Sequence, residues 1–309
     1  MIQIKHVAAC IGFLFFIQLM SGVCYPEDCV KIKPLFEIET GADQPSDISI
    51  APNRDIYLVD GVNNKIRVFD SKGRPKFDFG KKGSEKGEFD YPLGIDISDS
   101  GKVFIADSGN HRIQVFNLKG EFDYMFTVTS GPHGKPSDPV DVLVSKLKNY
   151  VYVSDNDNHK IKVYSQNGIF EFEWGSFGED HGQFRYPGIM AINEFNEIFV
   201  VDVLNTRVQK FDPFGNFIAD IGSWGVLPGK LFRPKGVALD KRNRVYISDS
   251  YMGFIQVFSD DGRFFGVVCE KGKNRQFVTP VGMAIDDKKQ SLHVVEMRAG
   301  KISVSKLLD

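Results

Sequence analysis

The sequence predicts an all-β fold of the β-propeller type, and three observations lead to this prediction. The chain of 309 residues is rich in Phe, with 27, and in Gly, with 30, which suits aromatic strands joined by tight turns. A ten-residue pattern recurs six times, and each recurrence belongs to a unit with room for four short strands. A repeat of this length with four strands is typical of a propeller blade.

The recurring pattern begins with an acidic residue and ends in an apolar run, as in DSGNHRIQVF at residues 107–116. Successive leading acids are 47 or 48 residues apart, and a proline ahead of each unit keeps nearly the same interval. The leading acids are Asp60, Asp107, Asp155, Asp202, Asp249 and Glu296. The prolines are Pro45, Pro92, Pro139, Pro187, Pro234 and Pro280. Six regular copies predict a six-bladed propeller.

The second unit shows the expected strands in order. Apolar runs at residues 92–98, 103–107 and 112–116 are followed by a turn at Gly120 and a fourth run at 121–128. Short β-rich runs separated by turn residues predict four antiparallel strands. The last unit ends after its third run, at 302–308, while residues 30–40 have the look of a fourth strand. We therefore expect the N-terminal strand to complete the last blade and close the ring.

These units resemble NHL repeats, whose pattern runs P-x-G-I-A-V-D and then V-Y-V-A-D-x-x-N-H-R-I-Q-V-F. The resemblance extends over about residues 35–307 and is closest in the second unit. The first, fifth and sixth units drift, with Met252 and Ala299 at the Asn position and Glu296 at the Asp position. The resemblance implies a stand-alone six-bladed NHL propeller, and it says little about function because propellers host many activities.

The first 24 residues differ from the rest and predict a secretory signal peptide, which leaves residues 25–309 for the propeller. Lys5 precedes an apolar run at 7–20, and small residues follow. That run is shorter than the roughly 20 residues that span a bilayer. An uncleaved membrane anchor and a lipid anchor on Cys24 stay open as alternatives. We therefore expect a secreted or periplasmic protein that contacts a membrane only through such an anchor.

Charge and cysteine content narrow the partner classes. The formal net charge of −2 gives no reason to expect nucleic acid as a partner, and we expect a monomer. Cys29 and Cys269 are the two cysteines outside the leader, and an oxidising compartment would allow them to pair. The sequence does not show whether they meet, so the disulfide is left open.

The residues shared by the repeats are interpreted as architecture. Each leading acid is expected to accept hydrogen bonds at a turn and to pair with the basic residue five positions on. Those basic residues are Lys65, Arg112, Lys160, Arg207 and Lys301. Glycines of the first strands, among them Gly94, Gly236 and Gly282, are expected to allow close packing near the axis.

Enzyme readings find little support among the residues. A relative of the NHL family, the peptide-amidating lyase, carries zinc-binding histidines directly after the repeat proline, and none of the six units has a histidine there. His133 and His181 lie in predicted loops between blades, where a two-histidine site is conceivable. A calcium site of the lactonase type would need inward oxygen ligands, and the candidates are Asp47, Asp96, Asp141 and Asn193. A channel-metal hydrolase therefore remains the alternative; otherwise no catalytic residue, metal or cofactor is assigned.

The repeats depart from one another just after the leading acids, and this difference predicts a docking surface. In the first three units these positions are mainly small or polar, whereas the last three carry apolar, Tyr, Met and Arg residues, which are enriched at protein interfaces. The predicted partner-binding residues are Val203, Leu204, Trp224, Tyr251, Met252, Met297 and Arg298. The sequence thus favours a non-catalytic binding or scaffold module for a protein or peptide, although the same side chains could instead fold over their own loops.

Overall fold

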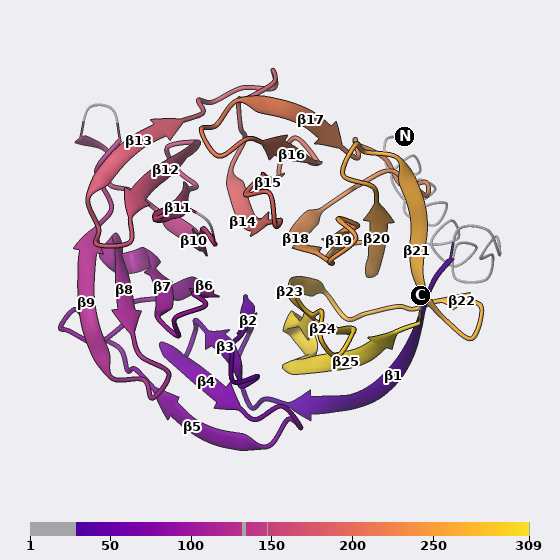
Figure 1. The fold of residues 1–309 in the computed structure, drawn as a ribbon, viewed down its shortest axis with the longest axis horizontal. Helices are drawn as coiled ribbons and strands as arrows, with labels where there is room; N and C mark the ends of the chain where they lie inside the picture. The colour runs from indigo at the N-terminus through magenta and orange to yellow at the C-terminus, as the bar shows by residue number, and fades with distance from the viewer. Residues whose placement is uncertain (1–28, 132–133, 147, 309) are drawn as a thin grey trace, which may run out of the picture.

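The computed structural model describes residues 29–131, 134–146 and 148–308, and within them the chain is all-β. The predicted signal peptide, residues 1–24, lies outside the described residues. Figure 1 shows the strands as a ring of sheets around a central axis. Four sheets have four strands each, and a fifth sheet has nine. Such four-stranded sheets, arranged radially, are those of a β-propeller.

We number the repeat units in chain order. Unit 1 contains β2 (Ile48–Ile50), β3 (Ile56–Asp60), β4 (Lys65–Phe69) and β5 (Pro75–Phe79). Unit 2 contains β6 (Pro92–Ile97), β7 (Val103–Asp107), β8 (Arg112–Phe116) and β9 (Phe122–Thr127), with a short 3₁₀ turn η1 at Ser108–Asn110. Unit 3 contains β10 (Pro139–Val144), β11 (Tyr150–Asp155), β12 (Lys160–Ser165) and β13 (Phe170–Trp174). Unit 4 contains β14 (Pro187–Ile192), β15 (Ile198–Asp202), β16 (Arg207–Phe211) and β17 (Phe217–Ile221).

The nine-stranded sheet holds the remaining repeats. Unit 5 contains β18 (Pro234–Leu239), β19 (Val245–Asp249), β20 (Phe254–Phe258) and β21 (Phe264–Glu270), and the short β22 (Lys273–Asn274) pairs with β21. Unit 6 contains β23 (Pro280–Asp286), β24 (Ser291–Glu296) and β25 (Lys301–Leu307), with a 3₁₀ turn η3 at Met297–Ala299. The N-terminal β1 (Cys29–Glu39) follows β25 in the order of this sheet.

Hydrophobic cores fill the spaces between neighbouring units. One cluster joins Val59 and Val68 of unit 1 to Val103 and Ile105 of unit 2. The second strand of each unit is buried throughout or nearly so, because both of its faces meet a neighbouring sheet, whereas the outer β9 alternates between half-buried and exposed. Phenylalanines pack in these cores: Phe116 contacts Phe79 and Phe89, with ring centroids 5.0 and 5.6 Å apart.

First-strand glycines sit where the axis crowds the backbone, as expected. A Cβ atom added to Gly236 would lie 2.1 Å from the carbonyl oxygen of Val281 in the next unit. One added to Gly94 would lie 2.4 Å from Oδ1 of Asp141. Any larger residue would push neighbouring first strands apart, so glycine is required at both positions.

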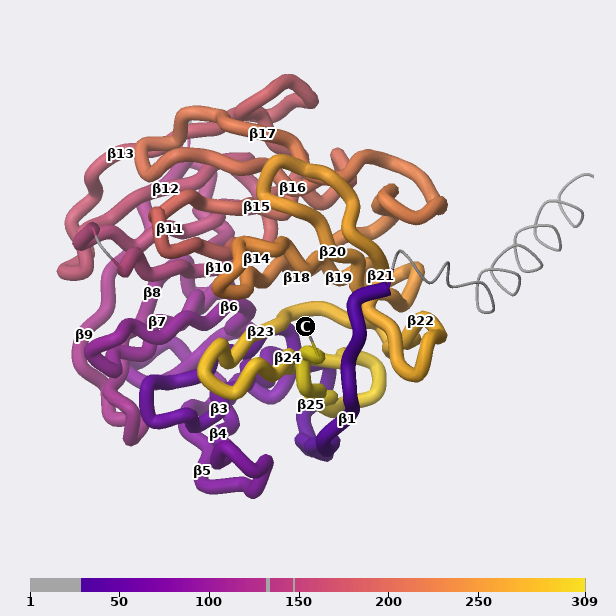
Figure 2. The backbone as a smooth tube through the Cα atoms, turned by 45° about the vertical axis from the view of Figure 1, so that its right-hand side comes forward, coloured from indigo at the N-terminus to yellow at the C-terminus, as the bar shows by residue number. Residues whose placement is uncertain are grey.

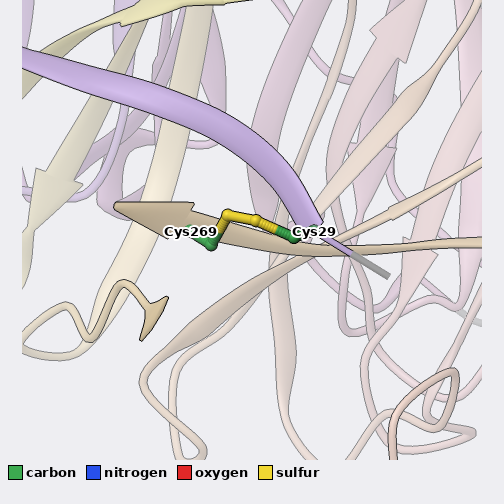
Figure 3. Close-up of a disulfide and its surroundings, with 2 residues drawn as sticks. All are labelled: Cys29 and Cys269. Atoms are coloured by element: carbon green, nitrogen blue, oxygen red, sulfur yellow. A yellow bond between two sulfur atoms is a disulfide. The ribbon is translucent and has the colours of Figure 1, made fainter. Parts of the chain in front are cut away.

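The N-terminal strand joins units 5 and 6. Strand β1 pairs antiparallel with β25 from Ile32 to Glu39 and parallel with β21 from Cys29 to Ile32 (Figure 2). A disulfide links Cys29 to Cys269 of β21, with Cα atoms 5.7 Å apart (Figure 3). The two cysteines therefore pair, which sequence separation alone left open. Within the described ranges no helix has the length and apolar character needed to cross a membrane.

Candidate functional site

Each unit has two ends, and they carry different loops. One end bears the turns from the second to the third strand together with the junctions that lead into each unit; we call this end the junction face. The other end bears the turns from the first to the second strand, such as residues 51–55, and from the third to the fourth strand; we call it the hairpin face. The predicted partner-binding residues all lie on the junction face, because each follows a second strand or lies in a junction.

The leading acids build the junction face rather than form a catalytic centre. Asp107 is fully buried and accepts hydrogen bonds from the Asp90 amide at 2.8 Å, from Asn110 at 2.9 Å and from Arg112 Nε at 2.7 Å. Arg112 in turn donates to main-chain carbonyls of residues 84, 85 and 88 in the junction. The acid and its arginine thus hold the incoming junction against the second strand, which is the architectural role expected from the repeat.

The expected pairing was wrong at Lys65 and Lys160. Asp60 pairs with Arg67 at 2.6 Å, and Asp155 pairs with the fully buried Lys162 at 2.6 Å. These cations lie seven positions after the acid, where the units that have Arg at the fifth position carry glutamine instead. An arginine at the fifth position can turn Nε towards the acid, whereas the Lys160 ammonium pairs outwards with Glu173. Each of the first four units therefore supplies one buried or half-buried cation to its acid, from one position or the other.

Unit 5 breaks this rule. Its acid, Asp249, is fully buried, but the fifth position holds Phe254 and the seventh holds Gln256. Four main-chain amides take the place of the cation, and they donate to Asp249 at 2.6–3.2 Å. The donors are Phe232, Arg233, Tyr251 and Met252. Unit 5 thus differs from the first four units because, within the described residues, its buried leading acid is neutralised by no cation of its own.

The repeat histidines link neighbouring units. The amide of Tyr186, in the junction to unit 4, donates to Nδ1 of His159 at 3.2 Å, and the imidazole packs against the rings of Phe177 and Tyr186. Burial lowers the pKa of His159 and so favours the neutral form that this acceptor role needs. At the equivalent position of unit 1, Oδ1 of Asn64 accepts a hydrogen bond from the Tyr91 amide at 2.8 Å. His159 is therefore a structural residue of the junction face.

The first strands enclose a cavity of about 360 Å³ on the axis. Its wall is divided: units 1–3 contribute the carboxylates of Asp47, Asp96 and Asp141 together with the exposed Asp99 and Lys146, whereas units 4–6 contribute apolar side chains that include Met190 and Met283. The fourth oxygen candidate, Asn193, is not part of this wall. It lies after β14 in the turn to β15, where its Oδ1 accepts the amides of Phe195 and Glu197. Its prediction as an inward ligand was wrong because the strand ends one residue earlier.

The three carboxylates bind the backbone of the next unit. Asp47 accepts the Ile95 amide at 3.0 Å, Asp96 accepts the Val144 amide at 2.8 Å and Asp141 accepts the Met190 amide at 2.7 Å. The inner edge of a first strand has no neighbouring strand, so its amides need such acceptors. Among the described residues, no group of three or more His, Cys, Asp and Glu side chains is arranged to hold a metal ion.

Burial changes the protonation of these acids. Desolvation raises the pKa of Asp47 to about 7 and that of Asp96 to about 6, because each carboxylate is surrounded by protein and few charges compensate. Desolvation, followed by the negative charge of Asp47, raises the pKa of Asp141 well above its ordinary value. These three carboxyl groups therefore become negatively charged at a higher pH than an exposed aspartate would.

This titration predicts a pH-dependent stability. The folded-state pKa of Asp47 lies above its unfolded value, so its contribution is lost as the pH rises from about 4 to about 7. Asp47→Asn removes the ionisation and keeps a carbonyl for the Ile95 amide. Raising the pH from 5 to 8 should lower the unfolding free energy of the parent by on the order of 2 kcal/mol more than that of the variant.

Urea titrations at the two pH values measure this difference, with the exposed carboxylate of Asp43, which does not line the axial cavity, as the matched control in Asp43→Asn. Parallel pH curves for the parent and Asp47→Asn would contradict the assignment.

The remaining histidines are scattered. His181 is largely exposed, stacks on Phe217 and lies 3.3 Å from Asp220. His293 is buried in β24, and burial lowers its pKa to about 4. His133, the other half of the conceivable two-histidine site, lies outside the described residues, so that site stays a prediction.

The structure divides the seven predicted partner-binding residues into two groups. Leu204, Trp224, Tyr251 and Arg298 are exposed, and Trp224 shows 71% of its surface to solvent. Val203, Met252 and Met297 are half-buried, and Val203 and Met297 pack against core clusters. We call the exposed apolar members Leu204, Trp224 and Tyr251, together with Leu227 at 57% exposure, the apolar row; all four lie on the junction face of units 4 and 5. A separate cavity of about 450 Å³ lies on the junction face of units 2 and 3, lined by polar and apolar residues that include Asp138, Asp157, Tyr91 and Leu93.

Two cations beside this row were missed in the sequence. Arg233 and Lys235 flank Pro234 at the entrance to unit 5, and both side chains are exposed. The other units have Ser46, Leu93, Val140, Gly188 and Val281 at the position of Lys235. Comparing the residues on either side of each repeat proline would have found them, since both positions become cationic in this one unit.

Comparison with known proteins agrees with the fold. The model of the NHL repeat matches residues 89–116 and 233–258. No curated protein matches the chain. A gluconolactonase from Xanthomonas campestris is 12% identical with a TM-score of 0.68, covering 93% of this chain and 98% of its own. A catalytically inactive virginiamycin B lyase from Staphylococcus aureus, solved with quinupristin, is 14% identical with a TM-score of 0.62, covering 87% and 82%. At these identities the likeness concerns the propeller fold alone.

Proposed function

We propose that this chain, which contains NHL repeats and folds as a β-propeller, is an exported, non-catalytic binding module whose protein or peptide partner docks on the junction face of units 4–6. We count the ring as six blades, with β1 as the outer strand of the sixth. The pairing of β1 with β25 supports this count, because the run β23-β24-β25-β1 has the four strands of the other units. One chain then forms the closed module, and we take it to be a monomer.

The apolar row is the observation that carries this proposal. Its four large apolar side chains stay exposed at the same end of units 4 and 5, and exposed apolar residues gathered on one face mark interaction sites more often than scattered ones do. Tyr251 rests on Phe232, with ring centroids 4.7 Å apart, so its ring is held in place before a partner arrives. An ordered aromatic of this kind loses little entropy on binding and suits an interface anchor.

The disulfide supports export. Pairs such as Cys29–Cys269 persist in oxidising compartments and are rare in the cytosol. The predicted leader at residues 1–24 agrees with a secreted or periplasmic location. No nucleic acid is expected as a partner, given the near-neutral charge of the chain.

Replacing the exposed members of the apolar row should abolish partner capture. We expect Leu204→Ser/Trp224→Ser/Tyr251→Ser to lower affinity for the partner by at least about 100-fold, because three apolar anchors of about 1 kcal/mol or more each are removed. Met297 is left unchanged, since it packs against a core cluster. Affinity is measured by surface plasmon resonance with the partner isolated from the cells that make the protein.

The matched control replaces exposed apolar residues on the hairpin face, as Ile169→Ser/Phe195→Ser/Phe214→Ser. If the control loses binding and the apolar-row variant keeps it, the docking face is assigned to the wrong end of the ring.

A metal-dependent hydrolase of the lactonase type is the second candidate. It is favoured by the axial cavity of about 360 Å³ with three carboxylates on one wall, and a calcium ion is the cofactor such oxygens would suit. Elemental mass spectrometry of the purified protein after dialysis tests it. One bound metal per chain would favour this candidate, and lactones and esters would then be screened as substrates.

A further inference from the structure

We propose that the partner segment is acidic and that three cations, Arg233, Lys235 and Arg298, bind its carboxylates beside the apolar row. We call these three residues the cationic set. The inference rests on the proposed docking function and adds the chemistry of the partner to it.

The cationic set is confined to two consecutive units. Arg233 and Lys235 stand before and after the repeat proline of unit 5, and Arg298 stands two positions after the leading acid of unit 6. In unit 3, two of the same three repeat positions are acidic instead, as Asp138 and Asp157. Unit 3 lies across the ring from unit 6, so these repeat positions are cationic on one side of the ring and acidic on the other (Figure 1). On the acidic side, Asp157 is paired with Lys135 at 3.6 Å.

The three cations have no internal use. Within the described part of the chain, none of their side chains forms an ion pair or a hydrogen bond, whereas Arg112 and Arg207 at the equivalent faces of units 2 and 4 are each held by a buried acid and by junction carbonyls. The leading acid of unit 5, Asp249, is already occupied by four main-chain amides. Phe254 occupies the place of the internal cation in this unit, so the positive charge of unit 5 on this face lies at its surface.

The surroundings favour a bound anion over free solvent. Desolvation lowers the pKa of Lys235, and the neighbouring Arg233 lowers it further, although the Lys235 side chain keeps an exposed surface. Two cations held close together in partly dehydrated surroundings are stabilised by a carboxylate between them. The ring of Tyr251, which packs at a tilt of 41° against Phe232 next to Arg233, offers an apolar contact alongside.

This combination fits a peptide better than a small anion. The exposed apolar residues Leu204, Trp224 and Tyr251 share the junction face with the exposed Arg298 of unit 6. An extended segment that alternates acidic and apolar side chains could meet the cationic set and the apolar row together. A duplex nucleic acid, whose bases are stacked inside the helix, would use only the cations.

Synthetic peptides test the inference directly. Three fluorescent 12-residue peptides share one apolar framework and carry either three Glu, three Gln or three Lys, and fluorescence anisotropy measures their binding at 50 and 500 mM NaCl. We expect the Glu peptide to bind at least about tenfold tighter than the Gln peptide at low salt, and the gap to narrow at high salt through screening. Arg233→Glu/Lys235→Glu/Arg298→Glu should reverse the preference towards the Lys peptide, which a merely misfolded variant would not do.

The control reverses charges on the hairpin face of the same two units, as Lys241→Glu/Lys288→Glu, and should leave the preference unchanged. Equal binding of the Glu and Gln peptides would overturn the inference. The docking function would survive that result if the variant Leu204→Ser/Trp224→Ser/Tyr251→Ser bound neither of these two peptides. Binding of none of the peptides would also overturn it, with docking judged by the partner measurement alone. A 12-base-pair DNA duplex that binds as tightly as the Glu peptide would overturn it in favour of an unspecific polyanion site.

Discussion

Asp107→Ala is expected to destabilise the propeller by about 3–5 kcal/mol, the cost of leaving a buried charge without its partner. The carboxylate is fully buried, and Arg112, only 7% exposed, depends on it for its Nε contact at 2.7 Å. The alanine also leaves the Asp90 amide and the Asn110 amide group without their acceptor. Urea unfolding followed by tryptophan fluorescence measures the change in unfolding free energy.

Unit 5 provides the matched control. Asp249 is equally buried, but it accepts only main-chain amides and no cation. Asp249→Ala leaves polar groups unsatisfied without stranding a charge, so we expect a smaller loss of about 1–3 kcal/mol. A loss at Asp249 as large as that at Asp107 would contradict the view that unit 5 has given up its internal cation.

Removal of the disulfide is the second change with a large expected effect. Cys29→Ser/Cys269→Ser should lower the unfolding free energy by about 2–5 kcal/mol, because the bond joins residues 240 positions apart and restricts the unfolded chain. It also ties β1 to unit 5 at the rim, where β1 has only four parallel partners in β21. The double-serine variant, which lacks this bond, should therefore expose β1 early in unfolding.

Thermal unfolding with and without dithiothreitol measures this effect. The parent under reducing conditions should match the double-serine variant, and the reductant should leave the variant unchanged. A parent whose unfolding temperature does not respond to reduction would show that the pairing of β1 with β25 alone secures the end of the ring.

Most of the propeller could be predicted from the sequence, because the repeat makes each strand visible six times. Local preferences of turns and of close backbone packing determine where the leading acids, the prolines and the axial glycines occur. The observed strands follow these signals, and β1 pairs with β25 as the incomplete last unit requires. The all-β prediction is confirmed, and the NHL resemblance is confirmed at two positions.

The parts that could not be predicted depend on contacts between units. Lys65 and Lys160 were assigned to the acids because the pattern fixes position in the chain but not the direction of a side chain; the acids are instead met by Arg67 and Lys162. The meeting of Cys29 with Cys269 follows from the place of β21 beside β1, which no local signal gives. Val203 and Met297 were predicted as partner-binding surface residues from their residue type, yet each is half-buried and packs against a core cluster.

Site-specific photo-crosslinking tests the central claim most directly, since it reports which face the partner touches. A photoreactive phenylalanine analogue replaces Trp224 or Tyr251 on the junction face, and Phe195 or Phe214 on the hairpin face, all four being exposed aromatics in units 4 and 5. The account predicts a crosslinked partner from positions 224 and 251 and none from 195 and 214. A partner crosslinked only from 195 or 214 would contradict it and direct attention to the hairpin face.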